Sequence, residues 1–274
     1  MGGSLGLALR KREAPWRVVG WNRSAEPLAH AVRIGAVECA CASVAELAAQ
    51  SDLMVVALPP DRVAPTLADV KPFLREGAVA TDVAGAKARI VREATGLLGA
   101  AFVGGHPMAG CERSGIEAAD ADLYAGATWI LTPTETTSGE ALAQVEELVR
   151  AVGARPFVCD AAEHDRWIAA CSHLPHVLAY GLAQAAESAG VPAGVAAGSF
   201  RDGTRVAAAD PVAWAGILLD NAHEVVRALD GMTVWLGAAR DAIACRDHNR
   251  LSRLLAEAHA AKESLGQDDP RVNG

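Results

Sequence analysis

The first part of the chain alternates short apolar runs with stretches of helical periodicity. Runs of this kind begin at Asp52, Gly77, Ala100, Ala127 and Ala154, and each is bounded by glycine, proline or aspartate. Short apolar runs with such boundaries are typical of buried strands, whereas the segments between them place apolar residues at helical spacing. This alternation predicts a parallel sheet with helices on both faces.

Beyond Asp160 the strand-like runs stop, and long segments of helical periodicity follow. One of these helices is expected to start near Asp210, with Pro211 at its first position. The sequence FRDGTR ahead of it looks irregular. The fold class is therefore α/β followed by all-α, with one domain over residues 1–160 and a helical domain over residues 161–274.

The chain opens on MGGSLGLALRKREAPWRVVGWNRS. Gly2 and Gly3 lead into an apolar-periodic helix, and WRVVGW then predicts a short buried strand. In a dinucleotide-binding fold, a strand runs into a glycine-rich turn, and the helix after that turn points its N-terminus at the pyrophosphate. Here no strand precedes the glycines. We therefore expect the DNA ahead of the Met1 codon to encode, in frame, a β-branched strand that ends in G-x-G.

Composition narrows the classes of function. The formal net charge is −8 and 21% of the 274 residues are charged, which argues against a nucleic-acid surface and fits a protein that handles small molecules. The six cysteines have no C-x-x-C spacing and the start of the chain has no secretory pattern, so we expect reduced thiols and a cytoplasmic location. The uncharged run from Trp167 to Ala186 is long enough to span a bilayer, but its histidines, proline and glutamine favour a buried helix.

His106 is the clearest candidate for proton transfer. It lies in GGHPMAGCERSG, directly after a predicted buried strand and beside Pro107. Open α/β sheets bind ligands at the carboxyl ends of their strands. A histidine there can accept the proton of a substrate hydroxyl while a hydride leaves the same carbon. A structural histidine that ends a strand fits the local sequence equally well.

The helical half offers a second group of polar residues. His173 and His176 in SHLPHVLA are three residues apart and nearly share a helix face. No carboxylate stands at the positions usual for a zinc site, so we predict no metal. Arginines and aspartates gather further on, in FRDGTRVAAADP. A guanidinium there could pair with a substrate carboxylate or could simply be solvated.

Three segments together resemble the prephenate/arogenate dehydrogenases of tyrosine biosynthesis. They are GGHPMAGCERSGIEAADADLYAGATWILTP, HDRWIAACSHLPHVLA and FRDGTRVAAADPVAWAGILLDN, in that order. The resemblance covers nearly the whole chain, and H-P-M-A-G-x-E-x-S-G is its most specific part. It implies a Rossmann-like NAD(P)-binding domain, whose first strand has no counterpart here, followed by a helical domain that forms a homodimer. It also implies oxidative decarboxylation of prephenate, or of arogenate, with hydride transfer to the nicotinamide.

The same resemblance implies roles for individual residues. His106 would be the catalytic base. The residues implied at the substrate are Arg205, which would pair with a carboxylate, Ser172 and His176 in the pocket, and Glu112, Asp202 and Trp214 at a polar gate. The residues expected at the cofactor are Gly2, Gly3, Ser4, Asn22, Arg23, Ser24, Pro59, Asp82 and Lys87.

The residues after the second strand bear on the choice of cofactor. An acidic residue there would bind the ribose hydroxyls of NAD, but this chain has Asn22, Arg23 and Ser24. Arg23 and Ser24 could hold a 2′-phosphate, which favours NADP, while Asn22 could still bond a ribose, so NAD stays open.

One position departs from the family pattern. The family has a serine in D-V-G-S-x-K that hydrogen-bonds the catalytic histidine, whereas Gly85 stands there in DVAGAK. Glycine cannot orient His106, so a backbone group, water or Cys111 would have to replace the serine, and a loss of roughly 10–100-fold in rate is expected by analogy with metal-site outer shells. This glycine and the missing strand also leave open a non-catalytic nucleotide-binding relative.

Overall fold

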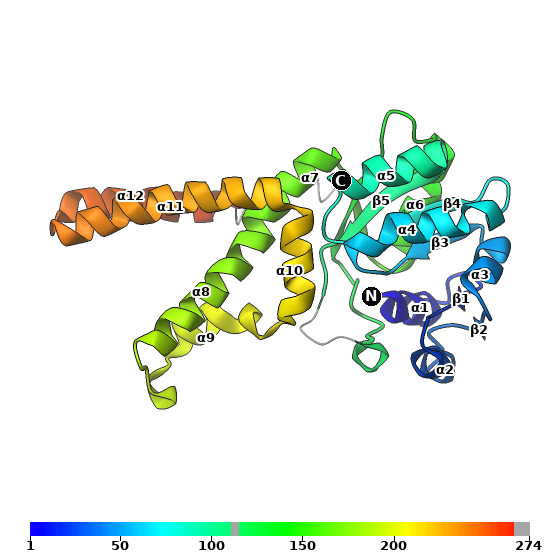
Figure 1. Cartoon of the computed structure of the whole chain (residues 1–274), viewed down its shortest axis with the longest axis horizontal. Helices are drawn as coiled ribbons and strands as arrows, with labels where there is room; N and C mark the ends of the chain where they lie inside the picture. The colour runs from blue at the N-terminus through cyan, green and yellow to red at the C-terminus, as the bar shows by residue number, and fades with distance from the viewer. Residues whose placement is uncertain (111–114, 266–274) are drawn as a thin grey trace.

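The computed structural model describes residues 1–110 and 115–265. Figure 1 shows an α/β domain on one side and helices α8–α12 extending away from it on the other, with α7 at the junction. This arrangement confirms the predicted fold class.

The main sheet has five strands in the order β3-β4-β5-β6-β7. Their bounds are Leu53–Val56 for β3, Val79–Asp82 for β4, Phe102–Pro107 for β5, Thr128–Thr132 for β6 and Arg155–Val158 for β7. The prediction of a wholly parallel sheet is wrong at one pair, because β6 runs antiparallel to β5 and places Ile130 opposite His106. In the described part of the connection between these strands the only helical segment is the short 3-10 turn Ile116–Ala118, and a parallel return would need a longer crossover.

Helices cover both faces of this sheet, as predicted. On one face α4 and α5 contribute to a core with β3 and β4, and on the other α1 and α6 contribute to a core with β5 and β6. The helices of this domain are α1 (Gly2–Lys11), α2 (Ala25–Arg33), α3 (Val44–Gln50), α4 (Pro60–Val70), α5 (Ala88–Leu98) and α6 (Gly139–Ala151).

A separate pair of strands lies next to α1. Strands β1 (Val19–Gly20) and β2 (Cys39–Ala40) form a two-stranded parallel sheet of their own. The buried strand predicted from WRVVGW is therefore wrong in extent, since β1 has only two residues and both are half-buried. In a Rossmann-type strand order, a first strand would lie between β1 and β3, and no described residue forms a strand there. The strand encoded ahead of Met1 stays a prediction.

The first helix after β7 is α7, and Asp160 caps it. Its carboxylate accepts the amide hydrogens of Ala162 and Glu163 at 2.8 and 3.2 Å. The predicted start of α10 is confirmed, because Asp210 caps it and Pro211 is its first residue. The elements are α7 (Ala161–Ile168), a π-helical turn (Ala169–His173), α8 (Leu174–Ser188), α9 (Gly198–Thr204), a 3-10 turn (Arg205–Ala208), α10 (Pro211–Asp220), α11 (Ala222–Ala244) and α12 (His248–Leu265).

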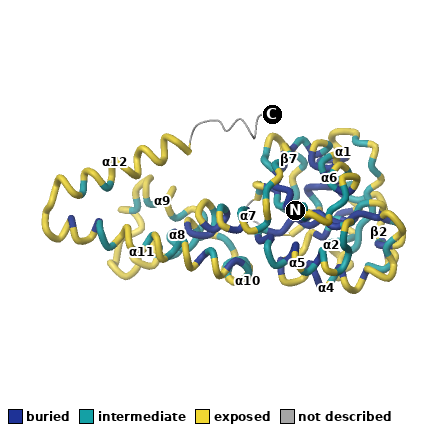
Figure 2. Tube along the Cα trace, turned by 90° about the horizontal axis from the view of Figure 1, so that it is seen from above, coloured by how far each residue is buried: buried dark blue, intermediate teal, exposed yellow. Residues whose placement is uncertain are grey.

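The segment that was expected to be irregular is helical instead, since α9 and the following 3-10 turn contain FRDGTRVAA. Figure 2 shows that α11 and α12 form a hairpin that is exposed over most of its length. None of the described helices is both long and apolar enough to cross a membrane.

Candidate active site

His106 lies near the carboxyl end of β5 and is half-buried. Its position depends on close contact between β5 and the end of β4. Gly105 donates its amide hydrogen to Asp82 Oδ1 at 3.1 Å. A Cβ at position 105 would come within 2.6 Å of the Asp82 carbonyl oxygen, so only glycine lets the two strands approach this closely ahead of the histidine.

One residue of α7, His164, bonds the ring of His106 from the helical domain, and its neighbour Asp165 bonds His164 in turn. His106 Nδ1 lies 2.8 Å from His164 Nε2, and His164 Nδ1 lies 2.8 Å from Asp165 Oδ1. The Asp165 carboxylate also accepts the amide hydrogens of Lys87 at 2.7 Å and Ala88 at 2.8 Å. The loop after β4, the end of β5 and α7 therefore meet at one hydrogen-bonded chain.

Burial governs the ionisation of this chain. Burial lowers the pKa of His106 well below its usual value, and repulsion from Lys87, and from His164 and His173 whenever these are protonated, lowers it further. Burial also lowers the pKa of His164, against the opposing effect of its bond to Asp165. Burial alone would raise the pKa of Asp165, but the bonds from His164 and the two amides outweigh it and the pKa is held below its usual value. At neutral pH the hydrogen-bonded group therefore consists of two neutral imidazoles, His106 and His164, and the ionised carboxylate of Asp165.

Asp82 and Lys87 form an ion pair at the two ends of the loop after β4. Neither side chain has any exposed surface, and the Lys87 ammonium bonds Asp82 Oδ2. Asp82 also accepts the amide hydrogen of Ala84 at 2.9 Å. The pair fixes this loop under His106, because a buried charge without its partner would cost several kcal/mol. Their expected contact with a cofactor stays a prediction.

Predicted substrate residues from α8 and α10 lie together in the helical domain. The ring of His176 stacks on Trp214 with centroids 3.3 Å apart, and His173 lies edge-on to the same indole at 6.2 Å. Burial lowers the pKa of His176 and the charge of Arg205 contributes to the same effect, so this arginine lies near the imidazole. Asn221 links the two groups of residues, since its Nδ2 donates to the Asp165 carbonyl at 2.8 Å and lies 3.3 Å from His173 Nδ1.

Three further predicted substrate residues are placed differently. Ser172 is half-buried and accepts a bond from His176 Nδ1 through its carbonyl oxygen at 2.9 Å. Asp202 is exposed on α9. Glu112 and Cys111 lie outside the described residues. The structure therefore brings His176, Trp214 and Arg205 together, while the roles assigned to all six substrate residues stay predictions.

The predicted cofactor residues lie at the N-terminal ends of three helices, α1, α2 and α4, and in the loop after β4. The α1 N-terminus carries Gly2 and Gly3, and Ser4 is buried with its hydroxyl accepting the Asp120 amide hydrogen at 3.1 Å. Asn22 to Ser24 are exposed ahead of α2, and the Asn22 side chain accepts the Ser24 amide hydrogen at 2.9 Å. Pro59 is exposed and caps α4.

These positions fit a dinucleotide. Figure 1 shows that the N-terminus of α1 is on the side of the α/β domain that faces α10, where β3, β4 and β5 also end. A Cβ on Gly2 would lie 3.1 Å from Ala57 Cβ, so the α1 N-terminus is close against the end of β3. Helix N-termini with free amides bind phosphate groups, and no acidic residue in the first turn of α1 opposes an anion.

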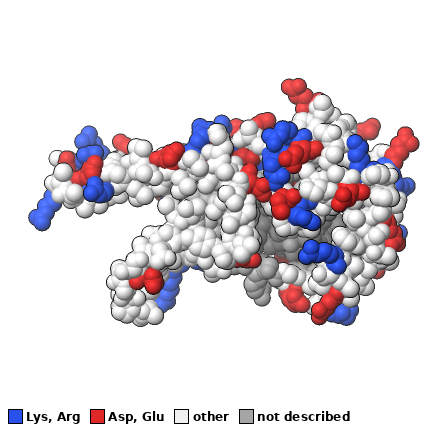
Figure 3. All heavy atoms as spheres, viewed as in Figure 1, with Lys and Arg blue, Asp and Glu red and all other residues white. Residues whose placement is uncertain are grey.

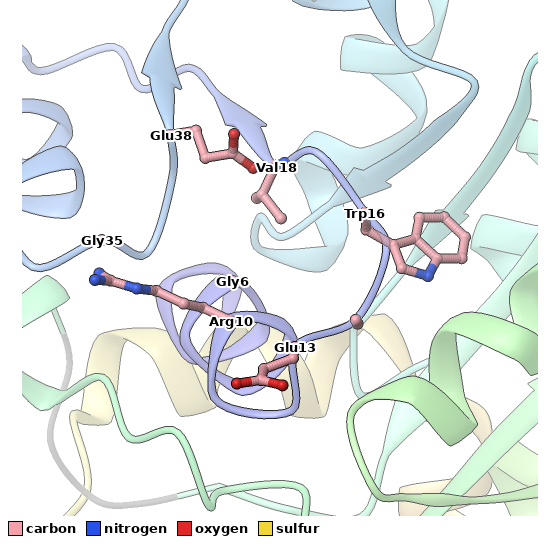
Figure 4. A pocket seen from close by; sticks show the side chains of 8 residues that line it. Gly6, Arg10, Glu13, Trp16, Val18, Gly35 and Glu38 are labelled. Atoms are coloured by element: carbon pink, nitrogen blue, oxygen red, sulfur yellow. Dashed lines mark hydrogen bonds between the residues drawn. The ribbon is translucent and has the colours of Figure 1, made fainter.

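One cavity of about 340 Å³ lies elsewhere in the α/β domain. Figure 4 shows it between α1 and the segments that lead into β1 and β2, with Arg10, Trp16, Val18 and Glu38 among its lining residues. None of the predicted site residues lines it. It is therefore not the site at which His106 would act.

The sequence interpretation missed His164, Asp165 and Asn221. His164 and Asp165 stand in the quoted segment HDRWIAACSHLPHVLA, immediately after the last predicted strand. A histidine and an acid side by side in the first turns of a helix that follows a sheet was the available signal. Their contacts cross 58 and 78 positions of the sequence, so only the fold identifies the partners.

An α/β domain of dinucleotide-binding type, with a histidine at a strand end and a helical domain bonded to it, defines the class of two-domain dehydrogenases. Residues 5–158 match the family model for the nucleotide-binding domain of prephenate dehydrogenase, and residues 160–257 match the model for its dimerization domain. The chain belongs to the prephenate dehydrogenase family.

Individual relatives agree with this membership. The prephenate dehydrogenase of Bacillus subtilis (strain 168) is 30% identical over 97% of this chain and 73% of that protein. A crystal structure of prephenate dehydrogenase from A. aeolicus in complex with hydroxyphenyl propionate and NAD+ has a TM-score of 0.89 at 29% identity, covering 96% of this chain and 94% of that one. The Synechocystis arogenate dehydrogenase structure has a TM-score of 0.83 at 28% identity, covering 96% and 95%.

Proposed function

We propose that this protein is a prephenate dehydrogenase, which converts prephenate to 4-hydroxyphenylpyruvate and carbon dioxide with NAD(P)+ as the oxidant. The observation that carries the proposal is His106, held at the carboxyl end of β5 by a hydrogen-bonded chain from the other domain. Relatives that bear the name prephenate dehydrogenase, and the one solved with NAD+, support the choice of substrate and cofactor.

His106 acts as the base in this reaction. Its neutral imidazole accepts the proton of the ring hydroxyl as the carbinol carbon is oxidised. The bound nicotinamide supplies a hydride acceptor at that carbon. The bond from the ring to the carboxylate then breaks, carbon dioxide leaves, and its electron pair passes through the ring to the former hydroxyl oxygen. That oxygen takes a proton back from His106, so the ring ends as a phenol.

The helical domain supplies the charge that binds the substrate. Prephenate carries two carboxylates, and Arg205 offers a planar guanidinium that can pair with one of them. His176 and Trp214 form a stacked wall beside it. Ser172, Asp202 and Glu112 belong to the same pocket in this proposal.

The cofactor is held by the α1 N-terminus and the exposed residues ahead of α2. Gly2, Gly3 and Ser4 lie at the pyrophosphate in this proposal. Arg23 and Ser24 are exposed, next to the turn that Asn22 makes with Ser24. A cation and a hydroxyl, in place of the acidic residue that would bind the ribose of NAD at the strand end, suit a 2′-phosphate, which favours NADP over NAD.

Arogenate is the second candidate substrate. It differs from prephenate in having an amino group where prephenate has a keto group, and the similar Synechocystis structure is named as an arogenate dehydrogenase. His106 and Arg205 would serve both substrates, because both carry the ring alcohol and the carboxylates.

The test is the absorbance at 340 nm with purified protein, using prephenate and arogenate in turn, each with NAD+ and NADP+. We expect turnover with prephenate and a higher kcat/KM for NADP+ than for NAD+. Turnover with arogenate alone would reassign the substrate. Tight cofactor binding without turnover of either substrate would instead support a non-catalytic nucleotide-binding relative.

A further inference from the structure

We propose that His164 and Asp165 are positioning residues which fix the tautomer of His106, so that Nε2 is the atom that accepts the substrate proton. The proposal rests on the function assigned to His106 above and goes beyond it, because it says which ring atom acts and what replaces the absent serine. It follows from hydrogen-bond geometry on the two sides of the ring.

The protons on the hydrogen-bonded residues His106, His164 and Asp165 can be assigned one after another, starting from Asp165. An ionised Asp165 carboxylate only accepts, so His164 Nδ1, at 2.8 Å, must donate to it. A neutral His164 then has a lone pair on Nε2, and His106 Nδ1, also at 2.8 Å, must donate to that atom. A neutral His106 is left with its lone pair on Nε2.

The carboxylate that starts this chain is itself held in place. Asp165 accepts two amide hydrogens, from Lys87 and Ala88 at the start of α5, and is almost fully buried. The Lys87 ammonium acts on both imidazoles, but it is paired with the Asp82 carboxylate, so the two opposite charges of this pair are both within the loop after β4. His173 faces the chain from the π-helical turn and is held by Asn221.

The other side of the His106 ring faces Gly85. A Cβ added to Gly85 would lie 3.7 Å from His106 Nε2 and 3.8 Å from Cε1, in ordinary contact. The family serine at this position would therefore reach Nε2 itself. Glycine places no side chain there, so the orientation of the ring comes from Nδ1, through His164 and Asp165.

The experiment compares four variants in the full chain. His164→Leu removes the acceptor opposite His106 Nδ1, whereas His164→Gln keeps a carbonyl oxygen there, with its amide drawn to Asp165. Asp165→Asn replaces the ionised acceptor by an amide that can either accept or donate. Asp160→Asn is the matched control, because Asp160 also accepts two amide hydrogens at a helix start, without a histidine partner.

Two readouts are measured for each variant. The first is the tautomer of His106, from imidazole ¹⁵N shifts of histidine-labelled protein, assigned by the signal lost in His106→Asn. The second is kcat and KM at pH 8. We expect the wild-type proton on Nδ1 and a fall in kcat of about 10–100-fold for His164→Leu and Asp165→Asn, with KM little changed. The corresponding carboxylate-to-amide change in the serine-protease triad lowers kcat by about 10⁴-fold through the wrong histidine tautomer, which shows that a tautomer change of this kind is large enough to measure.

His164→Gln should keep the wild-type tautomer and most of kcat, and Asp160→Asn should change neither readout. A wild-type proton on Nε2, or an unchanged kcat in His164→Leu, would overturn the proposal. If Asp165→Asn does not fold, the two His164 variants decide. A wild type that turns over neither substrate defeats the proposed function alone, because the tautomers are read without turnover.

Discussion

His106 is the residue on which the proposed chemistry depends. The sequence motif alone placed it at the end of a strand, and the structure puts it there. Its partners were beyond sequence reasoning. The replacement for the serine was sought in backbone, water or Cys111, whereas the structure supplies a histidine from the other domain.

Replacing His106 with Asn should lower kcat by about 10²–10⁴-fold, which is the usual contribution of general-base assistance, and leave cofactor affinity nearly unchanged. Initial rates and a fluorescence titration with NAD(P)H measure the two. His223→Asn, at an exposed position on α11, is the control. A variant with normal kcat would remove His106 from the reaction.

The acid limit of activity should lie below pH 6.5. The base works only when unprotonated, and burial, followed by repulsion from Lys87 and from His164 and His173 when these are protonated, lowers the pKa of His106 well below its usual 6.5. A lowered pKa keeps the imidazole neutral to a lower pH, so kcat/KM should stay level from pH 8 to 6.5 and fall only beneath that. The pH profile in one mixed buffer measures this. A fall centred at pH 7 or above would contradict the pKa shift.

Arg205→Ala should raise KM for the substrate by roughly 10–150-fold with a smaller effect on kcat, because a charge-assisted pair contributes about 1.5–3 kcal/mol. Arg201→Ala, an exposed arginine on α9, is the control. A second measurement compares how strongly two product analogues, one with and one without the side-chain carboxylate, inhibit the wild type and Arg205→Ala. We expect the variant to lose affinity mainly for the analogue that has the carboxylate. Equal losses for both analogues would mean that Arg205 is structural.

At the scale of elements, the sequence predicted best where a local signal decides the structure. Asp210 and Pro211 predicted the start of α10, because capping and a fixed φ act within a few residues. The antiparallel direction of β6 relative to β5 was missed, since the direction of a strand depends on the length and path of the connection that precedes it. The segment FRDGTR was missed as a helix, because α9 is short and gains its stability from tertiary contacts.

Asn221, between α10 and α11, joins the elements around the site. Its side chain is buried and reaches the Asp165 carbonyl and His173 Nδ1. Asn221→Ala removes both of these buried hydrogen bonds, so we expect a loss of about 1–3 kcal/mol in the free energy of unfolding. Urea denaturation measures it, with the exposed Gln184→Ala on α8 as a control that should change stability by less than about 0.5 kcal/mol. Equal free energies of unfolding for the two variants would show that the hydrogen bonds of Asn221 add nothing to the stability.

At the scale of the whole molecule, the helical domain exposes many large apolar residues, which a monomeric protein would normally bury. Figure 3 shows charged side chains crowded over the α/β domain and a largely uncharged surface over α10 and the adjoining helices. The exposed large apolar residues of α10–α12 are Val212, Leu219, Val226, Val234, Trp235, Leu236, Ile243, Leu255 and Leu265. Extended apolar surface of this kind marks an interface, and the matched model for this region is a dimerization domain.

We therefore infer that a second copy of this chain covers α11 and α12, and Val234, which is 74% exposed, is the position to test. Val234→Asp would bury an unpaired charge in the dimer at a cost of several kcal/mol, which corresponds to at least about a 100-fold weaker association. Light scattering after gel filtration over a range of concentrations should give a dimer for the wild type and a monomer for the variant.

Phe73→Asp is the matched control, because Phe73 is also an exposed apolar residue, 50% exposed, but lies in the α/β domain. It should remain dimeric. His106, His164 and Asp165 bond one another within one chain, so a folded Val234→Asp monomer should keep the His106 tautomer of the wild type. A wild type that runs as a monomer at every concentration, or dimers of equal affinity in both variants, would place the interface elsewhere or remove it.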